Sequence, residues 1–302
     1  MYILLMAGGV GSRFWPRSRT SMPKQTLNII GEKSMLQMTY DRIKPIVDDD
    51  KIIVITNKEI ADVVHQQLPN IPGQNIIAEP FGRNTAPCIG LACSVIMSRT
   101  GNARETMAVL PADHLIPEVK KFRDTLQFAS DYASNHDTLI TMGVTPTYPE
   151  TGYGYIQKAD VIEEINDKAV FKVKTFAEKP NLETAKLFLN SGDFLWNSGM
   201  FVWTVESIIK QFRLHLPEMA EFFEQITDSV DSEEMDEKIY DVYSRLKSTS
   251  IDYGVMEVAD NVSVIEANYE WNDVGSWEAV FKISEKDENG NGLTAALNMA
   301  LD

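Results

Sequence analysis

The first half of the chain alternates short hydrophobic segments with segments in which apolar residues recur at helical spacing. This alternation predicts β-strands joined by helices, the pattern of a parallel sheet. Ser34 and Gln37 form a capping box at the start of one predicted helix, and apolar residues between 122 and 133 mark another. The predicted strands are residues 2–6, 51–56, 75–79, 106–110 and 138–144.

The pattern changes after Val144. Residues 153–159 and 171–178 are typical of antiparallel strands around the polar insert 163–168, and we expect them to form an inserted sheet over the binding face. A helix is predicted from Pro180 to about Ser191, and an acidic helical region covers residues 205–246. The predicted fold is therefore α/β: a Rossmann-like, mixed but mainly parallel sheet flanked by helices, with an inserted antiparallel sheet.

Composition and charge narrow the functional classes. The chain has 302 residues and a formal net charge of −16, which disfavours a nucleic-acid partner bound through its phosphate backbone. Cys88 and Cys93 are spaced like neither a zinc site nor a redox pair, so we interpret both as buried structural residues. The apolar run 2–7 is too short to span a bilayer. We expect a cytoplasmic protein without a membrane partner.

A glycine-rich segment follows the first predicted strand and is accompanied by cations. Glycines lack a Cβ, so backbone N–H groups can approach phosphate oxygens closely. The spacing matches neither a P-loop nor a dinucleotide fingerprint, and a glycine-rich turn with surface arginines is the alternative. The candidate nucleotide-binding residues of this segment are Ala7, Gly8, Gly9, Gly11, Ser12, Arg13 and Lys24.

Two aspartates are candidates for a metal site. Asp113 follows the strand predicted to end at Leu110, where α/β folds place ligands, and Asp273 lies in an aromatic, turn-rich segment. Magnesium prefers one or two carboxylates together with substrate phosphate oxygens. Taken singly, Asp113 could instead be a helix cap and Asp273 a turn residue.

These motifs together resemble the sugar-1-phosphate nucleotidylyltransferases, and among them the mannose-1-phosphate guanylyltransferases. The resemblance runs from Tyr2 to Trp277. Its ordered motifs are Ala7-Gly8-Gly9-x-Gly11-x-Arg13, Trp15-Pro16, Pro23-Lys24-Gln25, Glu79-Pro80, Arg83-Asn84-Thr85-Ala86-Pro87, Pro111-Ala112-Asp113-His114, Thr151-Gly152-Tyr153-Gly154-Tyr155-Ile156, Glu178-Lys179-Pro180, Trp196-Asn197-Ser198-Gly199-Met200-Phe201 and Asp273-Val274-Gly275-Ser276-Trp277.

The resemblance implies transfer of GMP from GTP to mannose 1-phosphate, giving GDP-mannose and pyrophosphate. The sugar phosphate would attack the α-phosphorus in line, and catalysis would consist of positioning and charge neutralisation. The implied catalytic set comprises Arg13 and Lys24 on the triphosphate, with Asp113 and Asp273 binding Mg²⁺, or Mn²⁺ as an alternative. The implied residues for the sugar phosphate are Gly154, Glu178, Lys179 and Asn197.

The nucleotide base can be considered separately. Guanine presents hydrogen-bond donors at N1 and N2, which a carboxylate can accept together. Glu79 is the candidate carboxylate, with Asn84 and Thr85 close behind it in the sequence. The alternative is that Glu79 is a charge at a strand end and that Asn84-Thr85 caps the following helix; both roles can hold.

Residues 1–284 are expected to form the catalytic domain and residues 285–302 a short tail, the remnant or start of a C-terminal extension that many relatives carry. A homodimer is expected, although the sequence does not determine the oligomeric state. Two other functions stay open. One is another NTP:hexose-1-phosphate nucleotidylyltransferase, and the other is a non-catalytic GDP-mannose-binding regulatory protein.

Overall fold

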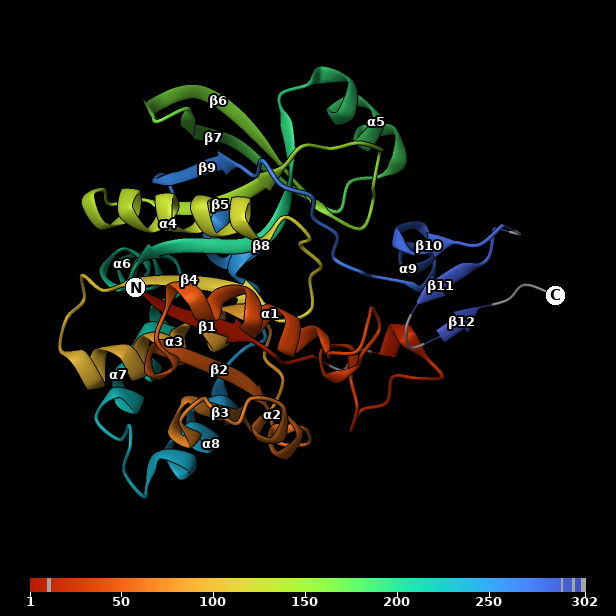
Figure 1. The fold of residues 1–302 in the computed structure, drawn as a ribbon. Helices are drawn as coiled ribbons and strands as arrows, with labels where there is room; N and C mark the ends of the chain where they lie inside the picture. The colour runs from red at the N-terminus through yellow and green to blue at the C-terminus, as the bar shows by residue number, and fades with distance from the viewer. Residues whose placement is uncertain (10–11, 289, 295–296, 300–302) are drawn as a thin grey trace.

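The computed structural model describes residues 1–9, 12–288, 290–294 and 297–299, and for Ser12 and the residues after 292 only the backbone. Nine strands in this part of the chain form one sheet, in the order β3-β2-β1-β4-β8-β5-β9-β7-β6 (Figure 1). They are β1 Tyr2–Met6, β2 Ile52–Asn57, β3 Ile76–Glu79, β4 Thr106–Pro111, β5 Leu139–Val144, β6 Gly154–Ile165, β7 Lys168–Glu178, β8 Phe194–Thr204 and β9 Val262–Glu266. A second, small sheet contains β10 Glu285–Lys286, β11 Gly292–Thr294 and β12 Leu297–Met299.

Helices cover both faces of the large sheet, and each face has its own hydrophobic core. Buried residues of α1, α2 and α4 pack on one face, whereas those of α3, α6, α7 and α8 pack on the other. Figure 1 shows α4 in front of the sheet. The helices are α1 Met35–Ile43, α2 Ala61–Gln67, α3 Thr85–Thr100, α4 Val119–Asn135, α5 Leu182–Ser191, α6 Val205–His215, α7 Pro217–Thr227, α8 Met235–Arg245 and α9 Trp277–Ile283.

The parallel part of the sheet confirms the sequence prediction. β1 pairs in parallel with β2 and with β4, and β2 pairs in parallel with β3. The carboxyl ends of these strands therefore lie along one edge, which is where α/β folds bind ligands. The capping box at Ser34 and Gln37 is also present at the start of α1.

The antiparallel part belongs to the same sheet. β8 lies between β4 and β5 and is antiparallel to both, while β7 pairs with β9 and β6 pairs with β7 and β8. The polar insert expected at 163–168 is mostly strand, because β6 runs to Ile165 and β7 starts at Lys168. Only Asn166 and Asp167 form the turn, with φ of 49° and 61°, values that Asn and Asp tolerate better than most residues.

The segment after β1 packs against the segment before and within α9. Phe14, Leu27 and Ile29 share a small core with Val274 and Val280. The rings of Phe14 and Trp277 meet edge to face at 5.0 Å, and Trp277 Nε1 donates to the Trp15 carbonyl at 3.2 Å. This packing brings the glycine-rich segment close to the loop that carries Asp273.

One further prediction concerns burial. Cys88 and Cys93 are buried free thiols on α3, as expected. Two tryptophans of β8 also pack in the interior: Trp203 is fully buried and Trp196 nearly so. Among the described residues, no helix combines the length and the apolar character needed to cross a membrane.

Candidate active site

Lys24 connects the predicted parts of the site. It opens a short 3₁₀ turn, Lys24–Thr26, and its side chain is almost wholly buried. Its Nζ forms an ion pair with Asp113 Oδ2 at 2.9 Å and donates to the backbone carbonyl of Asp273. The neighbouring Gln25 fixes this turn to the glycine-rich segment, because its Nε2 donates to the carbonyls of Ala7 and Gly8 at 2.7 and 3.1 Å.

The loops that carry Asp113 and Asp273 are joined directly. Leu115 and Asn272 exchange two backbone hydrogen bonds, of 2.9 and 3.0 Å. The Asn272 side chain also accepts from the Val274 N–H at 2.7 Å and so shapes the turn around Asp273. The structure thus brings together two aspartates that are far apart in the sequence, at the carboxyl end of β4.

Electrostatics keep Asp113 ionised. Burial raises the pKa of its carboxyl, but the Lys24 ammonium and then His114 lower it, and the net result is a pKa below the ordinary value. His114 behaves in the opposite way, because burial lowers its pKa to about 4 despite the attraction of Asp113. Its Nδ1 accepts from Trp271 Nε1 at 3.1 Å, so His114 is neutral at pH 7 and carries its proton on Nε2.

Tyr153 positions Asp273. Its hydroxyl donates to Asp273 Oδ1 at 2.7 Å, while its ring meets the rings of Trp196 and Trp271 edge to face at 5.3 and 5.1 Å. Burial and the Asp273 charge raise the pKa of Tyr153, so it stays a donor. Gly275 allows this arrangement, since a Cβ there would lie 2.8 Å from Asp273 Oδ2.

The donor set is compatible with a magnesium-like ion and with substrate oxygens completing its coordination. Asp113 is ionised. In the described part of the chain, no group of three or more His, Cys, Asp or Glu side chains is arranged so that it could hold a metal ion, so substrate oxygens would have to complete the coordination. A pair of carboxylates beside a phosphate site is the ligand pattern that Mg²⁺ takes with nucleotides.

Three of the residues predicted for the sugar lie together. Gly154 and Glu178 are paired across β6 and β7, and a Cβ on Gly154 would overlap Glu178 Oε2 and lie 3.3 Å from Asn197 Cβ. Lys179 adjoins them: its Nζ donates to Glu178 Oε1, and its N–H donates to the Tyr153 carbonyl at 3.2 Å. The Lys179 side chain is 59% exposed, and its ammonium forms an ion pair with the Glu178 carboxylate.

Glu79 lies beside the glycine-rich segment. It is 6% exposed, and its Oε2 is 3.5 Å from the position a Cβ on Gly8 would occupy. Burial raises its pKa to about 7, although the Tyr243 hydroxyl, which donates to Oε1 at 2.9 Å, lowers it. The carboxyl therefore changes its charge near neutral pH.

The capping interpretation of Asn84 is confirmed. Asn84 has φ 71°, and its Oδ1 accepts from the Thr85 N–H at 2.9 Å at the start of α3. The Thr85 hydroxyl accepts from the Ile251 N–H at 2.8 Å. A nucleotide-binding role for these two residues stays a prediction.

The remaining residues of the nucleotide set differ in accessibility. Ala7 is fully buried, and its N–H donates to the Ile55 carbonyl at 2.8 Å, so it supports the loop from beneath. Gly9 has φ 104°, a backbone conformation that favours glycine. Arg13 is exposed in the turn Ser12–Phe14. Gly11 and the side chain of Ser12 lie outside the described residues.

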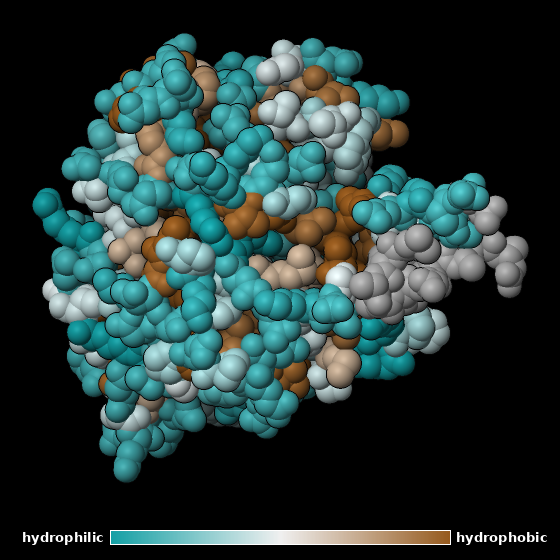
Figure 2. Space-filling view, in the orientation of Figure 1, coloured by the Kyte–Doolittle hydropathy of each residue, from teal (hydrophilic) through white to brown (hydrophobic). Residues whose placement is uncertain are grey.

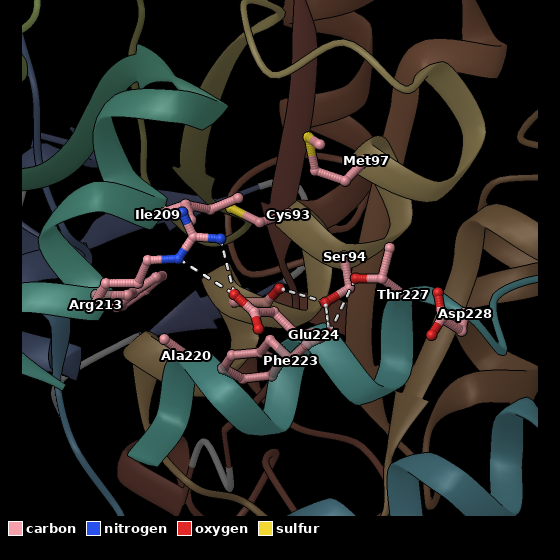
Figure 3. A pocket seen from close by; sticks show the side chains of 12 residues that line it. Cys93, Ser94, Met97, Ile209, Arg213, Ala220, Phe223, Glu224, Thr227 and Asp228 are labelled. Atoms are coloured by element: carbon pink, nitrogen blue, oxygen red, sulfur yellow. Dashed lines mark hydrogen bonds and ion pairs between the residues drawn. The ribbon is translucent and has the colours of Figure 1, made fainter. Parts of the chain in front are cut away.

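One cavity adjoins the candidate site, and another lies away from it. One of about 540 Å³ adjoins the Asp273 loop and is lined in part by Trp196, Trp271 and Asn272. The face drawn in Figure 2 is hollowed right of its centre, where hydrophobic residues are visible among hydrophilic ones. The other, of about 420 Å³, lies among α3, α6 and α7, and Figure 3 shows Cys93 and Phe223 at its wall and the Arg213–Glu224 ion pair. No residue of the predicted site lines this second cavity.

The comparison with protein families agrees with this geometry. The model of the family described as "Nucleotidyl transferase" matches residues 2–290. The chain belongs to the nucleotidyl transferase family. The sequence-based recognition of this family and the predicted α/β fold are thereby confirmed.

Named relatives are more specific. A protein of Salmonella montevideo named mannose-1-phosphate guanylyltransferase is 40% identical over 296 residues, which cover 95% of this chain and 61% of that protein. One of Escherichia coli with the same name is 37% identical over 297 residues, 96% of this chain and 63% of its own length. The chain thus spans about three fifths of the length of these relatives.

Solved structures show the same fold. A Thermus thermophilus protein, described as a mannose-1-phosphate geranyltransferase, superimposes on this chain with a TM-score of 0.82 at 32% identity. The superposition covers 95% of this chain and 79% of the Thermus thermophilus chain. A Helicobacter pylori structure described as a mannose-6-phosphate isomerase has a TM-score of 0.70 at 24% identity, with coverages of 90% and 100%, and supports the fold alone.

Sequence reasoning missed several residues that contact the candidate site residues. Tyr153 and Gln25 lie inside motifs named in the sequence analysis, next to the candidates Gly154 and Lys24. That position in the sequence could have indicated them. Tyr243 and Asp252, which contact Glu79 and Asn197, stand in the acidic helical region and just after it, where no motif marked them. Their roles depend on contacts between distant parts of the chain.

Proposed function

We propose that this nucleotidyl transferase moves GMP from GTP to mannose 1-phosphate and so forms GDP-mannose and pyrophosphate. The observation that carries the proposal is the contact of Lys24 with both aspartate loops. Asp273 in turn accepts a hydrogen bond from Tyr153, the neighbour of Gly154 in the sequence. The predicted phosphate site and the predicted sugar site would therefore adjoin. The names of the relatives from Salmonella montevideo and Escherichia coli support this choice of substrates.

Lys24 and Arg13 would neutralise the triphosphate. Lys24 is held in place by the ion pair with Asp113, and Arg13 is exposed on the adjacent turn. Preorganised cations of this kind stabilise charge that develops on phosphate oxygens during in-line transfer. Asp113 and Asp273 would hold Mg²⁺, or Mn²⁺ as the alternative, which supplies further neutralisation of the phosphate charge when bound.

No general base is required for the attack, because a sugar phosphate is already an anion at neutral pH. His114 suits this view: burial holds its pKa at about 4, and Arg42 Nη2 donates to its backbone carbonyl at 3.0 Å. We assign His114 to orienting the Asp113 loop. Lys179 would meet the phosphate of the sugar, while Gly154, Glu178 and Asn197 would meet its hydroxyls.

We assign the choice of guanine to Glu79. Its Oε1 accepts from Tyr243, and Oε2 lies beside Gly8, within the glycine-rich segment that would hold the nucleotide. As a carboxylate it can accept from guanine N1 and N2, whereas uracil and thymine present a single donor between two acceptors. Asn84 and Thr85 would complete this side of the site through the start of α3.

We extend the proposal to the domain bounds, the small-molecule partners, the location and the assembly of the protein. Residues 1–284 would form the catalytic unit, with β10–β12 following it. The partners would be GTP, mannose 1-phosphate, GDP-mannose and pyrophosphate. The cytoplasm is the expected location, and a homodimer the expected assembly.

Pyrophosphate release from purified protein with Mg²⁺ tests the proposal. GTP, UTP, dTTP and ATP are each combined with mannose 1-phosphate and with glucose 1-phosphate. Release confined to GTP and mannose 1-phosphate is the expected result. Release with another pair would identify a different nucleotidylyltransferase and overturn the role of Glu79. Binding of GDP-mannose without any release would indicate a regulatory binding protein.

A further inference from the structure

The side-chain amide of Asn197 has a fixed orientation. Asn197 lies in β8, and its Oδ1 accepts from Thr141 Oγ1 at 3.2 Å and from the Gly199 N–H at 3.1 Å. Its Nδ2 donates to Asp252 Oδ1 at 2.8 Å. Because the Gly199 N–H can only donate and an ionised carboxylate can only accept, the amide cannot flip. The oxygen is used, and one N–H of the amide is left over.

The amide nitrogen of Asn197 lies close to the Glu178 carboxylate. Asn197 Nδ2 is 3.6 Å from the position that a Cβ on Gly154 would occupy, and Glu178 Oε2 lies closer still to it, so the carboxylate fills the place of the missing Cβ. An amide donor and a carboxylate acceptor thus lie near each other. One hydroxyl group can accept from the amide while it donates to the carboxylate.

Asp252 brings a second carboxylate to Asn197, at 2.8 Å from its Nδ2. It begins the π-helical turn Asp252–Met256, a rare local geometry that is frequent at functional sites. Burial raises the pKa of Asp252, and after the opposing hydrogen bond from Asn197 the Glu178 charge raises it further. Two acids that repel each other are stabilised by a ligand that donates hydrogen bonds to both.

We propose that Asp252 is a positioning and specificity residue for the sugar: it locks the Asn197 amide with one N–H facing the hexose, and its second oxygen accepts from a hexose hydroxyl. This inference rests on the proposed function. The site then offers two carboxylate acceptors, Glu178 and Asp252, and one amide donor, Asn197. This combination suits neighbouring hydroxyl groups on a hexose. A hexose with a different hydroxyl geometry leaves a carboxylate without its donor, and such losses discriminate strongly between substrates.

Steady-state kinetics of Asp252→Asn test the inference. The new amide can still accept from Asn197 Nδ2 through its oxygen, but it places an N–H₂ group where the second carboxylate oxygen of Asp252 stood, so the KM for mannose 1-phosphate should rise by about 10-fold or more. The KM for GTP should stay within about two-fold, because no nucleotide contact changes. The ratio of activities on mannose 1-phosphate and glucose 1-phosphate should fall. The matched control is Glu257→Gln. Glu257 is a nearby acid, and among the described residues it forms no hydrogen bond with Asn197. This variant should leave both KM values unchanged.

A charge swap separates positioning from folding. The double variant Asn197→Asp, Asp252→Asn keeps a hydrogen bond between the two side chains but provides no amide N–H on β8. We expect it to fold, as measured by thermal unfolding and GTP binding, and to keep the raised KM for mannose 1-phosphate. Full recovery of that KM would show that Asp252 only holds the structure together.

An unchanged KM in Asp252→Asn would equally overturn the inference. The wild-type reaction is the internal test of the proposed function: if it releases no pyrophosphate from GTP and mannose 1-phosphate, that proposal fails. Calorimetric binding of mannose 1-phosphate and glucose 1-phosphate to wild type and Asp252→Asn then decides the role of Asp252 separately. Equal binding by both proteins would refute it.

Discussion

Replacing Glu79 by Gln should stabilise the fold while it impairs the enzyme. Burial raises the pKa of Glu79 from the ordinary value of 4.5 to about 7, so between these values the folded protein holds a proton that the unfolded chain releases. Stability therefore falls as the pH rises from 4.5 to 7. At about 1.36 kcal/mol per pH unit, the loss at pH 8 is about 3 kcal/mol, and at pH 5 about 1 kcal/mol.

Glutamine resembles the protonated carboxyl and carries no charge at either pH. It can still accept from Tyr243, so Glu79→Gln should raise the free energy of unfolding by about 3 kcal/mol at pH 8 and about 1 kcal/mol at pH 5. The other titratable groups beside Glu79 do not interfere, because burial first, and then the Glu79 charge, raise the pKa values of Cys88 and Tyr243 well above their ordinary values.

Urea unfolding at pH 5 and pH 8 measures both values, with Glu221→Gln on the exposed face of α7 as the control. The control should show no pH-dependent gain. If Glu79 reads guanine, Glu79→Gln should also raise the KM for GTP by about 10-fold or more, and the wild-type KM should fall as the pH rises through 7. An equal gain in stability at both pH values would refute the raised pKa, and an unchanged KM for GTP would refute the base-reading role.

Three further predictions concern the other parts of the site. Lys24→Ala should lower turnover by about 100-fold or more with the fold intact, whereas Lys33→Ala, which removes an exposed cation, should not; near-normal turnover would exclude Lys24 from catalysis. Asp273→Asn should weaken activity and Mg²⁺ dependence together, and an unchanged Mg²⁺ titration would make Asp273 a structural turn residue. Gly154→Ala should raise the KM for mannose 1-phosphate by about 10- to 100-fold, because the added Cβ displaces the Glu178 carboxylate; an unaltered KM would remove Glu178 from the sugar site.

The sequence by itself determined the local elements and the segments that carry chemistry. Strand and helix periodicity act over a few residues, so the strand at residues 2–6, the capping box at Ser34 and the cap at Asn84 were all predictable. The prediction of a polar insert at residues 163–168 was wrong. These residues are polar because this end of the β6–β7 hairpin is exposed, and most of them are in strands and not in a loop.

Only the tertiary structure decided how distant segments meet. Lys24 reaches the Asp273 loop across 249 positions of sequence, and Tyr243 reaches Glu79 across 164. No local propensity determines such contacts, because they follow from the order of strands in the sheet and from the packing of the segment after β1 against α9. The contact of Asp252 could not be predicted for the same physical reason: its partner Asn197 lies on β8, beside Gly154, and is 55 positions away in the sequence.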